Sequence, residues 1–265
     1  KTSFRVETQA AKESYYNLLH MKDEKTASHL ASQTPARINV GRAGSRPRTE
    51  TWLGFRADHA SARDSVLSDL SQDFMQNFVA VYDLPVVTSL AENRANFVLN
   101  PPQGKKLDAP VLQGLKETLQ AEGKAKSFDV QIVIADGLSS RAVEANLEDL
   151  YPMLIDGFAQ ENISLGKAVV VRQGRVAVAD QIAHALGAKV AINLIGERPG
   201  LSSAQSLSAY ITYNPGPQTI SSDRTVVSNI HSHGTPAVEA GAFIVKCTRR
   251  ILDLKASGVK LQLLG

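Results

Sequence analysis

"DVQIVIADGLS" (residues 129–139) is a short apolar run that ends in Asp-Gly. An apolar run bounded by a turn signal is typical of a buried β-strand. Helix and strand patterns then alternate at short spacing, in segments 140–162 (helix), 167–180 (strand and turn), 180–187 (short helix) and 188–200 (buried strand). This alternation predicts an α/β fold with an open, mostly parallel sheet flanked by helices.

Two further segments extend this pattern toward the C-terminus. "SLSAYITYNP" (206–215) alternates between apolar and polar residues, which predicts a strand that is less buried than its predecessors. Residues 236–258 predict a long amphipathic helix that Pro236 opens and Gly258 closes. Gly187 is expected to cap the shorter helix before it.

The N-terminal half is less regular and divides the chain into three expected regions. Residues 1–36 are polar, with one short helix expected around residues 15–19, and predict an arm that lies on a partner or is partly mobile. Residues 37–127 predict a mostly helical region that contains a turn-rich loop, a helix with apolar positions from Trp52 to Val66, and a second helix at 111–120. Residues 128–265 form the expected α/β domain.

Composition excludes several classes of protein. The 265 residues hold 43% hydrophobic residues, enough for a substantial core, but no apolar run of the length that a membrane helix needs. No stretch has the layout of a signal peptide, although a leader could have been removed before Lys1. Cys247 is the single cysteine, which excludes an internal disulfide and a cysteine-based zinc site. A net charge of +3 gives no indication of nucleic-acid binding.

The ends of the predicted strands are the natural place for a ligand. In open α/β sheets, ligands bind in the crevice beyond the carboxyl ends of the strands. Three glycine-containing tips are expected there, at 136–137, 174–176 and 196–200. Glycine lets a flat ligand approach the backbone closely, but the same residues also make ordinary turns, and both readings stay open. The dinucleotide pattern G-x-G-x-x-G and the P-loop pattern are both absent.

Other possible sites are weaker. His231 and His233 have a spacing that suits a metal but no third ligand nearby, and surface histidines are the usual alternative. Ser202 or Ser203 lacks the nucleophile-elbow pattern of a serine hydrolase. The arginines of the turn-rich loop suit phosphate groups or the acidic residues of another chain; they are Arg42, Arg46 and Arg48. No self-contained catalytic centre is evident, which favours a binding subunit whose chemistry comes from a cofactor or a partner chain.

Seven motifs occur in an order that identifies a family. They are "VGRAGSRPRT" (40–49), "FRADHASARDSV" (55–66), "VIADGLSSRAV" (133–143), "GRVAVADQI" (174–182), "GERPGLSSAQSLSAYITY" (196–213), "DRTVVSNIHSHGTP" (223–236) and "KASGV" (255–259). Together, over residues 37–260, they resemble the small subunit of ethanolamine ammonia-lyase.

The resemblance implies a subunit of a heteromeric, adenosylcobalamin-dependent lyase that converts ethanolamine into acetaldehyde and ammonia by a radical mechanism. In that family the large subunit is a (β/α)₈ barrel that binds ethanolamine, and the small subunit has a Rossmann-like C-terminal domain. Cobalamin lies between the two subunits, and the expected assembly is a heterododecamer in the bacterial cytoplasm. Some relatives enter an ethanolamine-utilisation microcompartment through a short N-terminal helix that is not recognisable here.

The resemblance also carries over to particular residues. Cobalamin-contacting positions of the family fall on Val176, Glu197 and Val226, and Arg175 and Arg198 are added as their neighbours. The family often has cysteine where this chain has Val226, which puts any role of a thiol in doubt. No catalytic residue and no metal ligand are expected in this chain. The alternative is a scaffold or regulatory subunit of the same complex that does not contact the cofactor.

Overall fold

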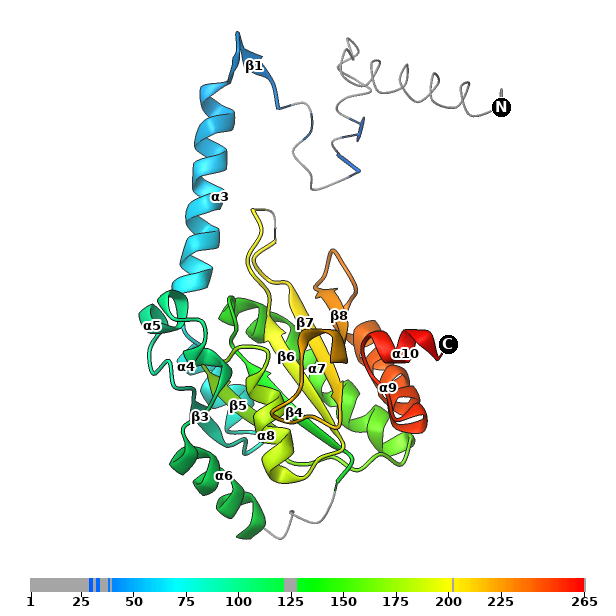
Figure 1. Ribbon diagram of the computed structural model, residues 1–265. Coiled ribbons are helices and arrows are strands. Elements are labelled where there is room, and N and C mark those ends of the chain that lie inside the picture. Colours follow the sequence, from blue (N-terminus) through cyan, green and yellow to red (C-terminus); the bar gives the residue numbers. More distant parts are fainter. Residues whose placement is uncertain are drawn as a thin grey trace, which may run out of the picture. The chain divides into compact units, whose positions relative to one another are not determined.

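The computed structural model describes residues 29, 30, 32, 33, 38, 40–121, 128–201 and 203–264 (Figure 1). Most of the expected N-terminal arm, including the short helix near residues 15–19, lies outside the described residues. The chain divides into two compact units, Lys1–His59 and Ala60–Gly265. The domain limits expected at 36/37 and 127/128 stay predictions.

In the first unit, the arginine-rich loop folds as a small antiparallel ribbon. Strands β1 (Arg42–Ala43) and β2 (Arg46–Pro47) pair across a turn in which Gly44 has a φ of +65°. Helix α3 (Thr49–Leu67) begins directly after this ribbon, as the apolar spacing predicted. Trp52 and Phe55 stack with their ring centroids 6.1 Å apart, yet 51% of Trp52 is exposed. The apolar positions that predicted the helix are therefore not core positions.

The second unit is built on a six-stranded sheet of order β3–β5–β4–β6–β7–β8 (Figure 1). The strands are β3 (Val86–Thr88), β4 (Val130–Ala135), β5 (Val169–Arg172), β6 (Val190–Gly196), β7 (Leu207–Tyr213) and β8 (Arg224–Ile230). The first four in spatial order run parallel, whereas β7 and β8 are antiparallel to their neighbours. The predicted fold class, an open and mostly parallel α/β sheet, is confirmed.

Helices cover both faces of this sheet. Along β4, Ile132 and Ile134 pack into the core formed with α7 (Ser140–Gln160) and α9 (Ala237–Leu254). Val133, which points the other way, packs against α6 (Ala109–Ala121) and α8 (Val178–Leu186). Successive side chains of a strand point to opposite faces, so a strand covered on both sides is apolar throughout. Every residue of β4 is accordingly buried.

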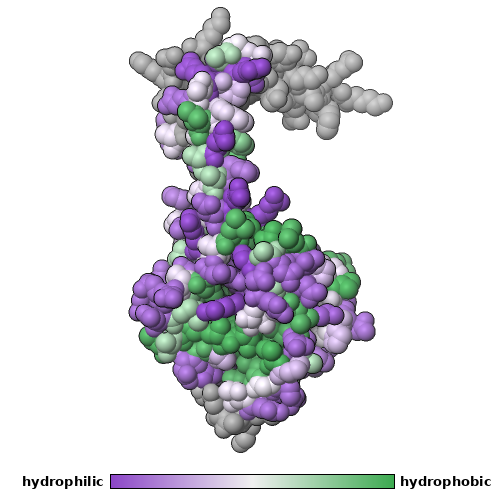
Figure 2. Space-filling view, turned by 90° about the vertical axis from the view of Figure 1, so that its left-hand side faces the viewer, coloured by the Kyte–Doolittle hydropathy of each residue, from purple (hydrophilic) through white to green (hydrophobic). Residues whose placement is uncertain are grey.

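Short elements join α3 to the sheet. They are α4 (Gln72–Phe74), a π-helical turn (Met75–Val79), α5 (Arg94–Leu99) and a 3₁₀ turn (Gln103–Lys105). Figure 2 looks onto this side of the molecule and shows apolar side chains at its surface. Val86 of β3 and Val98 and Leu99 of α5 are exposed. Among the described helices, none has the length and apolarity that crossing a membrane would require.

Two expectations about individual elements are corrected, and two strands were not expected. Strand β7 is buried at most positions, because it lies between β6 and β8 and is not at the edge of the sheet. Strands β3 and β8, which the sequence pattern did not reveal, form the two edges. Helix α9 ends at Leu254 because Lys255 takes a left-handed conformation (φ +51°), and Gly258 instead precedes α10 (Val259–Leu263).

The left-handed Lys255 gives a testable prediction about stability. Lys255→Gly is expected to raise the free energy of unfolding by about 0.5–1 kcal/mol, because glycine has no Cβ to strain the helix end. Lys246→Gly, an exposed position inside the same helix, serves as the control and should lower it by about 1 kcal/mol. Urea denaturation measures both changes, and a destabilised Lys255→Gly would contradict the prediction.

Candidate functional site

The carboxyl ends of β4, β5 and β6 meet beside a cavity of about 440 Å³, named here the strand-tip cavity. Its lining comes from all three predicted tips and from β7 and β8: Gly137, Leu138, Arg175, Val176, Ile195, Gly196, Glu197, Arg198, Ser208, Tyr210 and Ser228. The parallel part of the sheet brings the three tips to one edge, as the topology predicted. Four of the predicted residues, Arg175, Val176, Glu197 and Arg198, lie in this lining.

The tips of β4 and β6 approach too closely for any side chain. A Cβ atom on Gly137 would lie 2.3 Å from the carbonyl oxygen of Gly196, and Gly137 has a φ of +57°. A Cβ atom on Gly196 would lie 2.0 Å from the carbonyl oxygen of Ser139. Ser139 in turn caps α7, because its hydroxyl accepts the backbone N–H of Ala142. These glycines therefore fix the spacing of the strand ends that form the cavity.

Asp136, the residue directly after β4, does not line the cavity. Its buried carboxylate accepts the backbone N–H groups of Gln173 (2.9 Å) and Gly174 (3.0 Å). It also faces the Arg94 guanidinium, with Nη1 and Oδ2 3.4 Å apart. Burial raises the pKa of Asp136 to about 6, against the opposing effect of Arg94. Of the two alternatives, turn formation therefore describes Asp136, because its carboxylate holds the backbone of the neighbouring β5 tip.

Glu197 is held by three donors from β7, β8 and the loop between β6 and β7. The hydroxyls of Ser206 (2.9 Å) and Ser208 (2.5 Å) donate to its carboxylate, as does the backbone N–H of Asn229 (2.9 Å). An ionised carboxylate accepts about four hydrogen bonds, so Glu197 keeps roughly one acceptor position for a ligand. The family resemblance pointed to Glu197 as a cofactor contact, but the sequence gave no sign that its carboxylate also ties β8 to the tip of β6.

Arg175 is anchored at the cavity wall by α5 and by the 3₁₀ turn that follows it. Its backbone N–H donates to the carbonyl of Gly104 (2.7 Å), and its Nη2 donates to the carbonyl of Phe97 (2.9 Å). The guanidinium carbon lies 4.1 Å from the centre of the Phe97 ring. Burial and the nearby Arg94 guanidinium lower the pKa of Arg175. Its Nε atom is buried and has no hydrogen-bond partner among the described residues.

The remaining two predicted residues differ in position. Arg198 is exposed at the rim of the cavity. Val226 lies outside the lining, in a smaller hollow of about 290 Å³ that β8 forms with α10. It pairs with Tyr210 across the β7–β8 ladder, and Tyr210 does line the cavity. Because paired residues share a face of a sheet, Val226 is next to the cavity without entering it.

Ser208, Tyr210 and Ser228 are lining residues that the sequence analysis did not single out. Burial, followed by the charge of Glu197, raises the pKa of Tyr210. A signal was present, because Ser206, Ser208 and Tyr210 recur at a spacing of two and therefore share one face of a strand. What the sequence lacked was the pairing partner that would show which face meets the strand tips.

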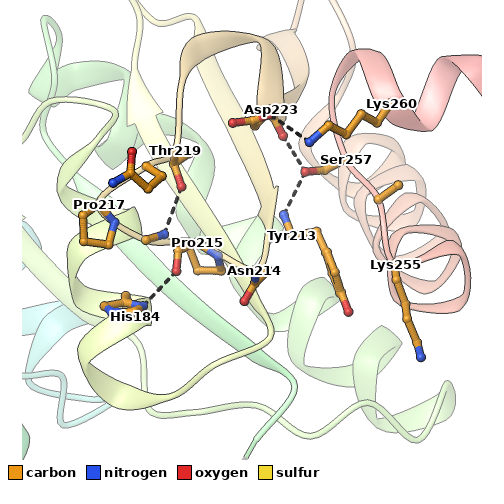
Figure 3. A pocket seen from close by; sticks show the side chains of 13 residues that line it. His184, Tyr213, Asn214, Pro215, Pro217, Thr219, Asp223, Lys255, Ser257 and Lys260 are labelled. Atoms are coloured by element: carbon orange, nitrogen blue, oxygen red, sulfur yellow. Dashed lines mark hydrogen bonds and ion pairs between the residues drawn. The ribbon is translucent and has the colours of Figure 1, made fainter.

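A second hollow of about 490 Å³ lies at the opposite end of β6 and β7, between the 214–219 loop and the turn before α10 (Figure 3). Its polar groups pair with one another: His184 Nδ1 lies 3.1 Å from the carbonyl oxygen of Pro215, and the N–H of Gly216 donates to Thr219. Lys260 lies 3.8 Å from Asp223. Although larger, this hollow contains none of the predicted residues and is less suited to a ligand than the strand-tip cavity.

The weaker alternatives find little support. No group of three or more potential metal-binding side chains occurs among residues 40–121, 128–201 and 203–264 or the few described before them. His231 Nε2 lies 2.8 Å from Asn229 Oδ1, on an exposed loop that also holds His233. Ser202 lies outside the described residues. The three loop arginines, Arg42, Arg46 and Arg48, are exposed on the β1–β2 ribbon and its junction with α3.

Comparison with known proteins decides the family. Residues 24–262 match the family model of the ethanolamine ammonia-lyase light chain (EutC). The chain belongs to this family. The chain is 45% identical to the ethanolamine ammonia-lyase small subunit of Fusobacterium nucleatum over 231 residues, which cover 87% of this chain and 75% of that protein. It is 43% identical to the small subunit of Clostridium tetani over 249 residues, covering 93% and 81%. The resemblance that the sequence motifs indicated is thereby confirmed.

Proposed function

We propose that the chain is the small subunit of an ethanolamine ammonia-lyase and that its strand-tip cavity holds part of adenosylcobalamin against a large subunit. The observation that carries this proposal is the meeting of Arg175, Val176, Glu197 and Arg198 in one cavity at the carboxyl edge of the sheet. These residues come from separate motifs, and the family resemblance had assigned each of them to the cofactor or to its immediate neighbourhood.

The lining fits the chemistry of the cofactor. Cobalamin is broad, carries amide groups around its rim and has one phosphate on its nucleotide loop. Glu197 keeps an acceptor for an amide or hydroxyl donor, whereas Arg175 has a buried Nε–H without a partner in the described chain. Leu138, Val176 and Ile195 supply apolar surface, worth roughly 25 cal/mol for each Å² of apolar area buried. Arg175 and Arg198 place positive charge where a phosphate could bind.

The size of the cavity supports a shared site. A cavity of about 440 Å³ is too small to enclose cobalamin, so this chain would cover one side of the cofactor and a large subunit the other. When bound, adenosylcobalamin supplies a carbon-centred radical through cleavage of its cobalt–carbon bond. The proposal gives this chain the tasks of orienting the cofactor and excluding water from one side, and it assigns the chain no catalytic residue.

The contact with the large subunit is proposed for residues 37–127. Exposed apolar side chains in this region support it, among them Trp52, Leu53, Val98 and Leu99. Apolar surface of this kind is typical of protein–protein contacts. The heterododecameric stoichiometry and the location in the cytoplasm or a microcompartment stay expectations from the family resemblance.

The most direct test is reconstitution. The chain is co-purified with a candidate large subunit from the same organism, and visible absorption is recorded while adenosylcobalamin is added. We expect ethanolamine turnover only when both chains and the cofactor are present. Turnover of ethanolamine by the isolated chain would overturn the proposal.

Glu197→Ala separates cofactor binding from a purely scaffolding role. The variant is expected to raise the apparent KM for adenosylcobalamin about tenfold while the complex still assembles, because a hydrogen bond to a charged group is worth about 1.5–3 kcal/mol. Glu148→Ala, an exposed position on α7, is the matched control and should leave the KM unchanged. An unchanged cofactor KM in Glu197→Ala would favour the scaffold or regulatory alternative.

A further inference from the structure

The β5 tip contains a buried residue with an unusual backbone. Gln173 has a φ of +57° and is 4% exposed. Only a few per cent of residues other than glycine have a positive φ, and glutamine is not among the enriched types. Such a conformation costs on the order of 1–3 kcal/mol and persists only when surrounding contacts enforce it. Gln173 directly precedes Gly174 and the two cavity residues, Arg175 and Val176.

The contacts that enforce this conformation hold both the backbone and the side chain of Gln173. Its N–H donates to Asp136, and its carbonyl accepts the hydroxyl of Ser89 at 2.7 Å. Its side-chain Nε2 donates to Asp69 at 2.7 Å, and its Oε1 accepts Arg94 Nη1 at 3.3 Å. Four residues from separate parts of the chain therefore fix one residue of the β5 tip.

Arg94 contacts the residues that support the cavity in two ways. Its guanidinium contacts Gln173 and Asp136, which together set the backbone of the β5 tip. It also contacts the aromatic ring of Phe97. The Arg94 Cζ atom lies 4.7 Å from the centre of this ring, and the Arg175 Cζ atom lies 4.1 Å from it. Arg94 is 7% exposed, and its Nε donates to the carbonyl of Val66 at 2.5 Å. It is a rigid and buried group that does not itself line the cavity.

We infer that Gln173 and Arg94 are positioning residues for the cofactor site: they hold the β5 tip in its left-handed turn and thereby aim Arg175 and Val176 into the strand-tip cavity. This inference rests on the proposed cofactor-binding function. A preformed tip lets the cofactor bind without the free energy needed to order a loop. The segment between α3 and α6, in which the sequence indicated no site residue, thus becomes part of the support of the site.

Gln173→Gly is the decisive variant, because glycine adopts a positive φ without strain and the fold should be retained. Of the hydrogen bonds of Gln173, it removes only those that the side chain makes with Asp69 and Arg94. With the complex of both subunits, the dissociation constant of adenosylcobalamin, followed by its visible absorption, is expected to rise about tenfold, whereas kcat at saturating cofactor stays within about threefold. Amide hydrogen exchange of residues 172–176 in the cofactor-free complex should become faster.

Asn162→Gly is the matched control. Asn162 also has a positive φ (+54°), but it lies at the end of α7, outside the lining of the cavity. This variant should leave the dissociation constant and the exchange of residues 172–176 unchanged. Arg94→Lys is the second variant: lysine keeps the charge beside Asp136 but not the planar guanidinium over Phe97. It should weaken cofactor binding in the same direction.

Val176→Glu distinguishes failure of this inference from failure of the proposed function. If Val176→Glu abolishes cofactor binding while Gln173→Gly and Arg94→Lys bind as tightly as the wild type, the positioning role is wrong and the proposed site stands. If Val176→Glu also binds the cofactor normally, the site itself is wrong and the positioning role falls with it. Weaker binding in Gln173→Gly but not in Asn162→Gly supports the inference.

Discussion

Replacing Asp136 by Ala is expected to lower the free energy of unfolding by about 3–5 kcal/mol, because one partner of a buried ion pair is removed and the other is left behind. The variant leaves the Arg94 guanidinium without its nearest carboxylate and leaves the N–H groups of Gln173 and Gly174 without acceptors. For a chain of this size the melting temperature should fall by about 10 °C, as circular dichroism would measure.

Two companion variants show whether the ion pair is the cause. Asp149→Ala, at an exposed position on α7, should change the stability by no more than about 0.5 kcal/mol. The double variant Arg94→Leu/Asp136→Leu should lose less stability than the sum of the two single changes, because it leaves no unpaired buried charge. Strict additivity of the two single effects would contradict a direct interaction between Arg94 and Asp136.

Asp136 also gives stability a pH dependence of known sign. Burial raises its pKa to about 6, whereas an aspartate in an unfolded chain has a pKa of about 4. Between these values the folded state binds more protons than the unfolded state, so the contribution of Asp136 to stability decreases as pH rises from about 4 to about 6. Asp136→Asn removes this contribution. The stability of the wild type minus that of Asp136→Asn should therefore fall across this window and become flat above about pH 7.

Val176→Glu is expected to weaken binding of adenosylcobalamin by at least about 100-fold while the subunits still assemble. The change places a carboxylate in the apolar part of the cavity, where burying an unpaired charge costs several kcal/mol. Val176 is half-buried in the lining, and its carbonyl accepts Asn193 Nδ2 at 3.0 Å, so the backbone contact survives the substitution. Spectroscopic titration of the complex with the cofactor measures the effect.

The control for this variant is the same substitution on a different surface. Val238→Glu on α9 introduces a carboxylate at a side chain that is already 53% exposed and lies outside the cavity. It should bind the cofactor as the wild type does. Wild-type affinity in Val176→Glu itself would show that the strand-tip cavity does not hold the cofactor.

The elements that the sequence predicted well are those defined by local patterns. The apolar run of β4 identifies a strand covered on both faces, and Gly187 ends α8 with a φ of +76°, as expected for a glycine cap. Helix α9 was predicted too long, because Lys255 takes the left-handed conformation that glycine normally supplies and so gave no stop signal. The local sequence therefore predicts the type of each element better than it predicts the residues at which the element begins and ends.

Features that depend on distant contacts were not predictable. Strand β3 is three residues long and pairs with β5, which follows it by more than eighty positions, so no local signal marks it as part of the sheet. The positive φ of Gln173 results from contacts with Asp69, Arg94 and Asp136 rather than from its own preference. Four of the predicted site residues lie together at the strand tips, because parallel topology brings these tips to one edge of the sheet.

The wall of the strand-tip cavity is shared between strands of opposite direction. Gly137 follows β4 in the parallel part of the sheet, whereas Ser208 and Ser228 belong to the antiparallel strands β7 and β8. A truncated protein that ended before β7 would keep the parallel strands but lose Ser208, Tyr210 and Ser228 from this wall and two of the three donors that hold Glu197. The proposed ligand site is thus not modular: an excised peptide bearing a single motif could not reproduce its wall, because the lining comes from strands far apart in the sequence.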